Sequence, residues 1–123
     1  MTPPSPRRGD IWLVNFTPGR GSEQLGMRPA LVIQNDVGNQ YAATTIVAAI
    51  TSTVKIYPVT VPLKKGEAGL NQPSMVNLAQ ILMIDKSRLQ RRLRALSAET
   101  VDRVDTAIRT SLDLGWRHVS LRG

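Results

Sequence analysis

Apolar residues along the chain cluster in short runs that predict a mostly β protein. Three of these runs are rich in aromatic and β-branched side chains and are separated by turn-forming residues; they read "DIWLVNF" at 10–16, "PALVIQN" at 29–35 and "TTIVAAITS" from Thr44. We expect a strand in each. Because their apolarity is nearly continuous, these strands are predicted to be buried on both faces or closed into a barrel.

Two further segments extend the predicted sheet. "IYPVTVPL" at 56–63 contains Pro58 and Pro62, which lack a backbone N–H and therefore place this strand at an edge or a bulge. "SMVNLAQILMI", from Ser74 to Ile84, predicts one long bent strand or two short ones.

A long helical pattern occurs only near the C-terminus. Ser97 is a candidate N-cap, Glu99 lies in the first turn, and Gly115 is placed to end the helix. The predicted apolar stripe, which would pack on the sheet, consists of Val101, Val104, Ile108 and Leu112. "DKSRL" at 85–89 predicts a single short turn. The expected fold is mostly β with a C-terminal helix, an α+β arrangement built as a small SH3-like β-barrel.

The length of 123 residues predicts a single folded domain at residues 8–115, with a flexible N-terminal arm at 1–7 and a loose tail at 116–123. The opening residues, "MTPPSP", contain no apolar signal region, and no apolar run approaches the roughly 20 residues of a membrane helix. We therefore expect a cytoplasmic protein that has no membrane partner.

The charge balance indicates an anionic partner. The chain has 16 Lys and Arg residues against 9 Asp and Glu, a formal net charge of +7, so nucleic acid is the first candidate. It contains no cysteine and a single histidine, His118, which leaves few side chains for a metal site or a nucleophilic pair. We expect neither a metal ion nor a cofactor.

The segment between the first two predicted strands combines glycines with an unusual set of polar residues. Arg20, Ser22, Glu23 and Gln24 supply phosphate-binding, hydroxyl-binding and base-reading groups within five positions, as recognition of single-stranded RNA requires. On residue types alone, a solvated turn is the more frequent explanation of such a loop.

Three other polar residues mark the ends or the interior of predicted strands. Arg28 precedes Pro29 and is biased to an extended conformation, Thr51 ends the third strand, and Gln80 interrupts an apolar segment, where a buried amide requires a partner or a ligand. Each also has an ordinary structural explanation. An arginine snorkels at a strand end, and a terminal hydroxyl satisfies backbone groups.

Taken together, these segments resemble the MazF/PemK family of toxin endoribonucleases. The resemblance runs from about Arg8 to Gly115. It is carried by "RGDIW" at 8–12, "GSEQLGMRPALVIQND" at 21–36, "TIVAAITS" at 45–52, "QI" at 80–81, "IDKSRL" at 84–89 and the helix ending "TSLDLG".

The resemblance implies a metal-independent ribonuclease that cuts single-stranded messenger RNA at short motifs and leaves 2′,3′-cyclic phosphate and 5′-hydroxyl ends. It implies a homodimer with RNA along the groove at the two-fold interface. The family's partner is a MazE-type antitoxin whose flexible acidic tail occupies that groove. The resemblance implies that the toxin contacts DNA only indirectly, through its complex with the antitoxin. By matching motifs, Arg28 and Thr51 are the implied catalytic residues. The implied RNA-binding residues are Arg20, Ser22, Glu23, Gln24, Ser74 and Gln80.

The sequence departs from the family pattern at one place. Many members carry "QIRTID", whereas this chain reads "QILMID", with Leu82 and Met83 replacing Arg and Thr. We expect this replacement to change the RNA motif that is cut and the pairing with the antitoxin more than the cleavage chemistry. A cluster of basic residues has two possible roles, an accessory track for RNA or a solvated surface. We expect the solvated surface, because such clusters on turns and short helices are commonly just that. The cluster comprises Lys64, Lys65, Arg91, Arg92 and Arg94.

The implied chemistry is consistent with the residue types. Arg28 would grip two phosphate oxygens and deliver a proton to the departing oxygen, but a guanidinium stays protonated at neutral pH and is a poor general base. Thr51 would hold the phosphate or orient the 2′-hydroxyl, and Glu23 or solvent would accept the proton. Two alternatives remain open. They are a CcdB-type toxin that poisons DNA gyrase without nuclease activity, and a basic RNA-binding barrel.

Overall fold

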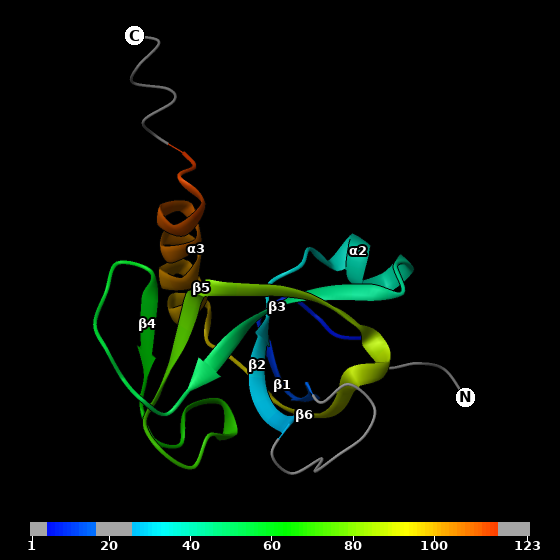
Figure 1. Cartoon of the computed structure of the whole chain (residues 1–123), viewed down its shortest axis with the longest axis horizontal. Coiled ribbons are helices and arrows are strands. Elements are labelled where there is room, and N and C mark those ends of the chain that lie inside the picture. The colour runs from blue at the N-terminus through cyan, green and yellow to red at the C-terminus, as the bar shows by residue number, and fades with distance from the viewer. Residues whose placement is uncertain (1–4, 17–25, 116–123) are drawn as a thin grey trace, which may run out of the picture.

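The computed structural model describes residues 5–16 and 26–115. Its elements follow each other along the chain as shown in Figure 1. They are β1 (Asp10–Asn15), β2 (Met27–Val32), α2 (Asp36–Tyr41), β3 (Thr44–Thr51), β4 (Thr60–Leu63), η1 (Glu67–Gly69), β5 (Ser74–Asp85), η2 (Lys86–Arg88), β6 (Leu89–Ala95) and α3 (Ala98–Leu112). The predicted mostly β fold with a C-terminal helix is confirmed.

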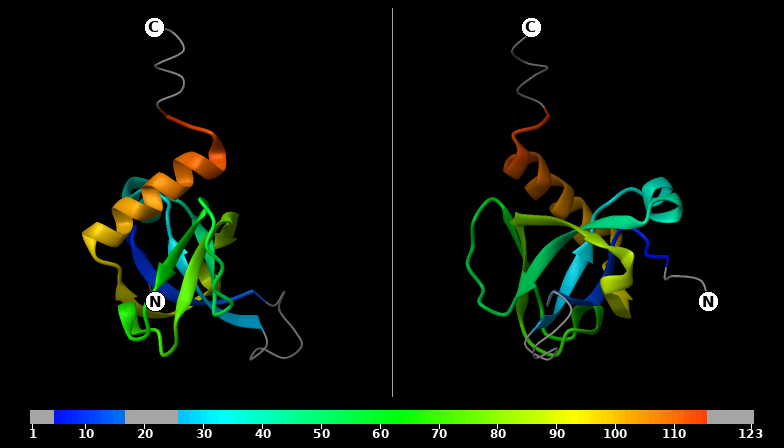
Figure 2. Two further views of the ribbon diagram at one scale, coloured as in Figure 1. Left: turned by 90° about the vertical axis from the view of Figure 1, so that its left-hand side faces the viewer. Right: turned by 45° about the vertical axis from the view of Figure 1, so that its right-hand side comes forward.

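The strands form one antiparallel six-stranded sheet in the order β4-β5-β3-β2-β1-β6. The long strand β5 pairs with β3 on both sides of a bend near its middle. It then leads through η2 into β6, which pairs with β1 at the other edge of the sheet (Figure 1). This connection curls the sheet into a partly open barrel. α3 lies across the outside of the barrel and contacts β4 and β5 (Figure 2).

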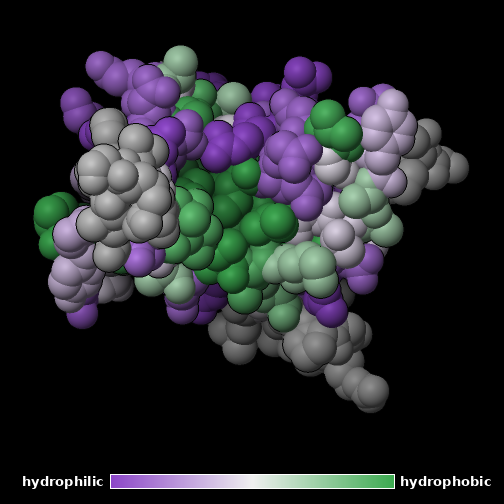
Figure 3. Space-filling view, turned by 90° about the horizontal axis from the view of Figure 1, so that it is seen from above, coloured by the Kyte–Doolittle hydropathy of each residue, from purple (hydrophilic) through white to green (hydrophobic). Residues whose placement is uncertain are grey.

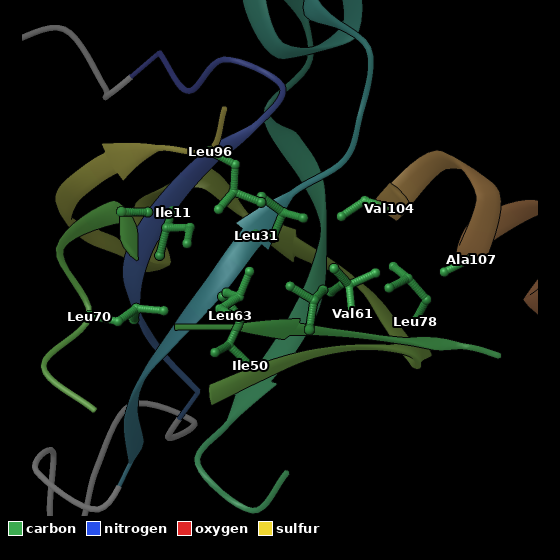
Figure 4. Packing of buried hydrophobic residues seen from close by; sticks show 13 residues of the cluster. Ile11, Leu31, Ile50, Val61, Leu63, Leu70, Leu78, Leu96, Val104 and Ala107 are labelled. Atoms are coloured by element: carbon green, nitrogen blue, oxygen red, sulfur yellow. The ribbon is translucent and has the colours of Figure 1, made fainter. Parts of the chain in front are cut away.

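Both faces of the central strands are buried, as their continuous apolarity predicts. Ile11 of β1 lies opposite Leu31 of β2, which lies opposite Ala48 of β3, and all three belong to the core beneath β4, η1 and α3. In that core, Val104 and Ala107 of α3 point toward the sheet (Figure 4). The intervening positions of the same strands face a second core inside the curled half of the barrel; it contains Trp12, Val14, Ala30, Val32, Val47, Ile84 and Leu89.

β5 is one long strand with an irregularity near its middle. Ala48 of β3 pairs with Ile81, while the next residue, Ala49, pairs with Asn77, so residues 78–80 lie between two registers. Extra residues of this kind bend a strand and interrupt its ladder. Gln80 lies in this bend and is exposed, so its amide does not face the buried environment that the sequence pattern indicated.

Strand β6 was not predicted, and the arginine cluster is therefore placed differently from expectation. Arg91, Arg92 and Arg94 lie on a strand, not on a turn or a short helix. The segment carries only two leucines, four positions apart, which hides the period of two on which strand prediction depends. The predicted turn before it is confirmed as η2.

Two element boundaries and one position of the helix stripe also differ from the predictions. β4 begins at Thr60, after Pro58, although its place at the sheet edge is as expected from its prolines. α3 begins with the predicted Ser97 cap, whose hydroxyl accepts the N–H of Thr100, but it ends at Asp113 in the left-handed conformation before Gly115 is reached. Leu112 is 53% exposed and does not belong to the buried stripe.

The short helix α2 is a further element that the apolar pattern missed. Its N-cap is Asn35, whose side-chain oxygen accepts the N–H of Gly38 at 2.8 Å. Buried Asn39 anchors it to the sheet, because its side chain bonds both Gln34 and the hydroxyl of Thr45. The anchoring is polar, so no apolar stripe marks this helix in the sequence.

Arg8 ties the chain start to two helices. Its backbone N–H donates to the Asp36 carboxylate at 2.7 Å, and its guanidinium bonds the Ile33 carbonyl and Asp105 of α3, each at 2.8 Å. The hydrogen bond from the Arg8 backbone, assisted by the Asn39 amide, lowers the pKa of Asp36 below its ordinary value. In the described part of the chain, no helix is long and apolar enough to cross a membrane.

Candidate functional site

A cavity of about 470 Å³ lies at one end of the barrel, between the start of β2, the end of β3, the segment around η1, and β6. Its apolar lining comes mainly from Leu13, Ile50, Leu70 and Leu93. The polar residues around it are Arg28, Thr51, Ser52, Asn71, Gln72, Ser74 and Arg91. A smaller cavity of about 300 Å³ lies between β4 and α3, and none of the predicted site residues lines it.

Strand register explains why Arg28 and Thr51 meet at this cavity. Ala30, Leu31 and Val32 of β2 pair with Ala49, Ala48 and Val47 of β3, and extending the register by two residues places Arg28 opposite Thr51. Arg28 is exposed and Thr51 is half-buried. A guanidinium and a hydroxyl, separated by 23 positions in sequence, are thus presented to one hollow on adjacent strands.

The hydroxyl of Thr51 is oriented by the chain that follows it. Its oxygen accepts the backbone N–H of Thr53 at 3.2 Å. Its own proton is not donated to any residue in the described ranges and can be offered to an anion.

Ser74 lines the same cavity at the start of β5. It is only 4% exposed, and its hydroxyl donates to the Gln72 carbonyl at 3.0 Å. The oxygen of Ser74 can therefore still accept a hydrogen bond, whereas its proton is engaged. Gln80, in the bend of β5, does not line this cavity.

The remaining predicted residues, Arg20, Ser22, Glu23 and Gln24, lie outside the described residues. The described residues on the two sides of this segment are joined by a hydrogen bond. The N–H of Phe16 donates to the carbonyl of Gly26 at 2.8 Å, and Gly26 is two positions before Arg28.

The electrostatics of the cavity favour an anion. Among the described residues that line it, the charged ones are Arg28 and Arg91, and no carboxylate is present. Arg92, the neighbour of Arg91, pairs instead with Asp10 at 3.1 Å, and the hydrogen bond to this carboxylate raises the pKa of Arg92. The described residues contain no group of three His, Cys, Asp or Glu side chains that could hold a metal ion. Two guanidinium groups and several hydroxyl and amide groups suit a phosphate ester better than a neutral ligand.

Sequence reasoning missed four polar residues of this cavity. Ser52, Asn71 and Gln72 lie in connecting segments whose composition is ordinary for turns, so nothing in the sequence sets them apart. Arg91 was recognised as part of a charged cluster but not as a site residue. Its strand shows no clear period of two, so no local signal set Arg91 apart.

Residues 7–112 match the model of the family described as PemK-like, MazF-like toxin of type II toxin-antitoxin system. The chain belongs to this toxin family.

Similar proteins support the assignment at the level of sequence and fold. The toxin is 45% identical over 111 residues to endoribonuclease MazF of Staphylococcus saprophyticus, a match that covers 88% of the toxin and 92% of that protein. Toxin MazF-mt6 of Mycobacterium tuberculosis is 28% identical with a TM-score of 0.75, covering 87% and 99% of the two chains. A crystal structure of MazE-MazF from Deinococcus radiodurans matches at 26% identity with a TM-score of 0.72, covering 90% and 98%.

The toxin also exposes apolar side chains on β5 and α2. Leu82 and Met83 of β5 are 42% and 71% exposed, and Val37 and Tyr41 of the nearby helix α2 are exposed as well. Figure 3, a view from above, shows apolar surface uncovered among polar residues on one face of the molecule. Clustered apolar residues at a surface are typical of protein contacts.

Proposed function

We propose that the toxin is a metal-independent endoribonuclease that cuts single-stranded RNA, chiefly messenger RNA, at short sequence motifs in the cavity of Arg28 and Thr51. It is a homologue of endoribonuclease MazF. The observation that carries the proposal is the convergence of Arg28 and Thr51, the two residues implied by the family motifs, on one cavity lined by arginine and free of described carboxylates.

The proposed reaction uses a nucleophile that the RNA itself supplies. The 2′-oxygen attacks the adjacent phosphorus, the bond from phosphorus to the 5′-oxygen breaks, and the products carry a 2′,3′-cyclic phosphate and a 5′-hydroxyl. The proton of the 2′-hydroxyl passes to Glu23 or to water, and the departing 5′-oxygen receives a proton from Arg28. No protein nucleophile is needed, so the absence of cysteine from the sequence is compatible with this chemistry.

Arg28 and Thr51 stabilise the charge that develops on the phosphate. The planar guanidinium of Arg28 donates two parallel hydrogen bonds to phosphate oxygens, and the hydroxyl of Thr51, its oxygen fixed by the N–H of Thr53, donates a third. Bound RNA is read by Arg20, Ser22, Glu23, Gln24 and Ser74. Gln80 would contact a nucleotide outside the cavity.

We further propose that the toxin acts in the cytoplasm as a homodimer that a MazE-type antitoxin neutralises. The family is defined by type II toxin-antitoxin systems, and the related Deinococcus toxin was crystallised as MazE-MazF. The exposed apolar residues of β5 and α2 would be covered in the homodimer. An acidic, flexible antitoxin tail would compete with RNA for the arginines of the cavity, and DNA would be contacted only by the antitoxin complex.

The proposal predicts cleavage without any divalent cation. The pure toxin, incubated with a long unstructured RNA in excess EDTA, is expected to cut at discrete positions that share a short motif and to leave cyclic-phosphate ends. Cleavage should weaken as salt is raised, because counterions are released when arginines bind phosphates. RNA that stays intact would instead favour the gyrase-poisoning or RNA-binding alternatives.

A further inference from the structure

We propose that Arg91 is a second phosphate-binding residue of the cavity, which holds a phosphate of the RNA close to the one that is cut at Arg28. This inference rests on the proposed ribonuclease function and extends it to a residue that the family motifs do not assign and that the sequence analysis expected on a solvated face.

The strand pairing places Arg91 on the cavity side of β6. Arg91 pairs with Leu13 of β1, and Leu13 pairs with Pro29 of β2. Arg28 itself pairs with Val14, so its place in the cavity lining, not a shared strand face, brings it together with Arg91. Residues directly opposite each other on antiparallel strands point to the same face, so Arg91 lies on the face of Leu13. Leu93, two positions further along β6, shares that face, and both leucines line the cavity with Arg91.

The spacing suits two phosphates of one strand. Arg91 and Pro29 are two inter-strand steps apart, or about 10 Å between backbones. A nucleic-acid strand stacked as in a duplex advances by about 3.4 Å per nucleotide, so arginines on strands this far apart can contact phosphates of one strand that are a few nucleotides apart. The apolar lining of the cavity, including Leu13, would face the bases of the bound strand.

The arginines of β6 differ in whether they form an ion pair within the protein. Arg92 points to the opposite face and is paired with Asp10. Neither Arg91 nor Arg28 forms an ion pair with any residue in the described ranges. Two unpaired guanidinium groups around one cavity repel each other, and a bound polyanion removes this repulsion.

A purely structural role for Arg91 has to be separated from this one. β6 is an edge strand of the sheet, and positively charged side chains on edge strands prevent pairing with other chains. That explanation applies equally to Arg94, which is exposed on the same strand but does not line the cavity. Arg94→Ala is therefore a matched control that removes the same charge from the same strand.

The test measures kcat and KM on a short RNA that contains one mapped cleavage site, in excess EDTA and at several salt concentrations. Arg91→Ala is expected to raise KM about tenfold with kcat within about twofold of wild type, as loss of one charge-assisted contact requires. The slope of log(kcat/KM) against log salt should become shallower by about 0.7, the value for one phosphate contact to a single strand. Arg91→Lys should restore the slope but only part of the affinity, because an ammonium group cannot donate the paired bonds of a guanidinium.

Arg94→Ala should leave KM, kcat and the salt slope within about twofold of wild type, and thermal melting should show that every variant is folded. If Arg91→Ala and Arg94→Ala have the same KM and salt slope, Arg91 is only an edge charge and the inference is wrong. A fall in kcat at unchanged KM would contradict it as well. A wild-type protein that leaves the RNA intact would overturn the proposed function itself, a result distinct from a normal wild type with a silent Arg91→Ala.

Discussion

Arg28→Ala is expected to lower kcat/KM for RNA cleavage by about 100-fold to 1,000-fold. The substitution removes the preorganised donors that face the developing phosphate charge, and loss of such a donor typically has an effect of this size. Arg28 is exposed and forms no ion pair with a described residue, so the free energy of unfolding should change by no more than about 0.5 kcal/mol.

Two further variants sharpen this result. Arg28→Lys keeps the charge but not the paired donors, so its activity should lie between those of wild type and Arg28→Ala. Arg94→Ala controls for the loss of one positive charge. Cleavage by Arg28→Ala within tenfold of wild type would show that the reaction takes place elsewhere.

Leu31→Ala is expected to lower the free energy of unfolding by about 3 to 5 kcal/mol. Leu31 is 1% exposed at the centre of the larger core, between Ile11 and Ala48, where truncation loses apolar burial and leaves a cavity. For a domain of ordinary stability, this loss is a large fraction of the total. The measurement is urea denaturation followed by circular dichroism.

Leu112→Ala supplies the same change of side chain at an exposed position of α3 and should alter the stability by less than about 0.5 kcal/mol. Equal effects of the two substitutions would mean that Leu31 is not the centre of the core. At temperatures where Leu31→Ala remains folded, its cleavage rate should stay near wild type, because Leu31 does not line the cavity.

The fold could be predicted where local sequence and tertiary environment agree. The strands at residues 10–15, 27–32 and 44–51 are buried on both faces, so their composition alone marks them. β6 could not be recognised in this way, because only Leu89 and Leu93 of its seven residues face apolar surroundings. α2 depends on the hydrogen bonds of Asn39, which have no periodic signature.

The candidate site was predictable only in part, because pairing between distant strands brings some of its residues together. Arg28 and Thr51 belong to motifs that resemble a known family, and the register of β2 and β3 then brings them together. Arg91 enters the cavity through pairing between β1 and β6, segments separated by more than 70 positions, and no local pattern specifies that pairing. For Gln80, the bend of β5 decides the outcome, since it turns a position inside an apolar segment toward solvent.

Replacement of the attacking hydroxyl tests the central claim most directly. Two RNAs of the same sequence would be compared in excess EDTA, one unmodified and one with a single 2′-deoxynucleotide on the 5′ side of the mapped cut. The account predicts that the unmodified RNA is cut to a cyclic phosphate and that the modified RNA is not cut at that position. Cleavage of both RNAs at similar rates would show that the nucleophile is not the 2′-hydroxyl and would contradict the proposed mechanism.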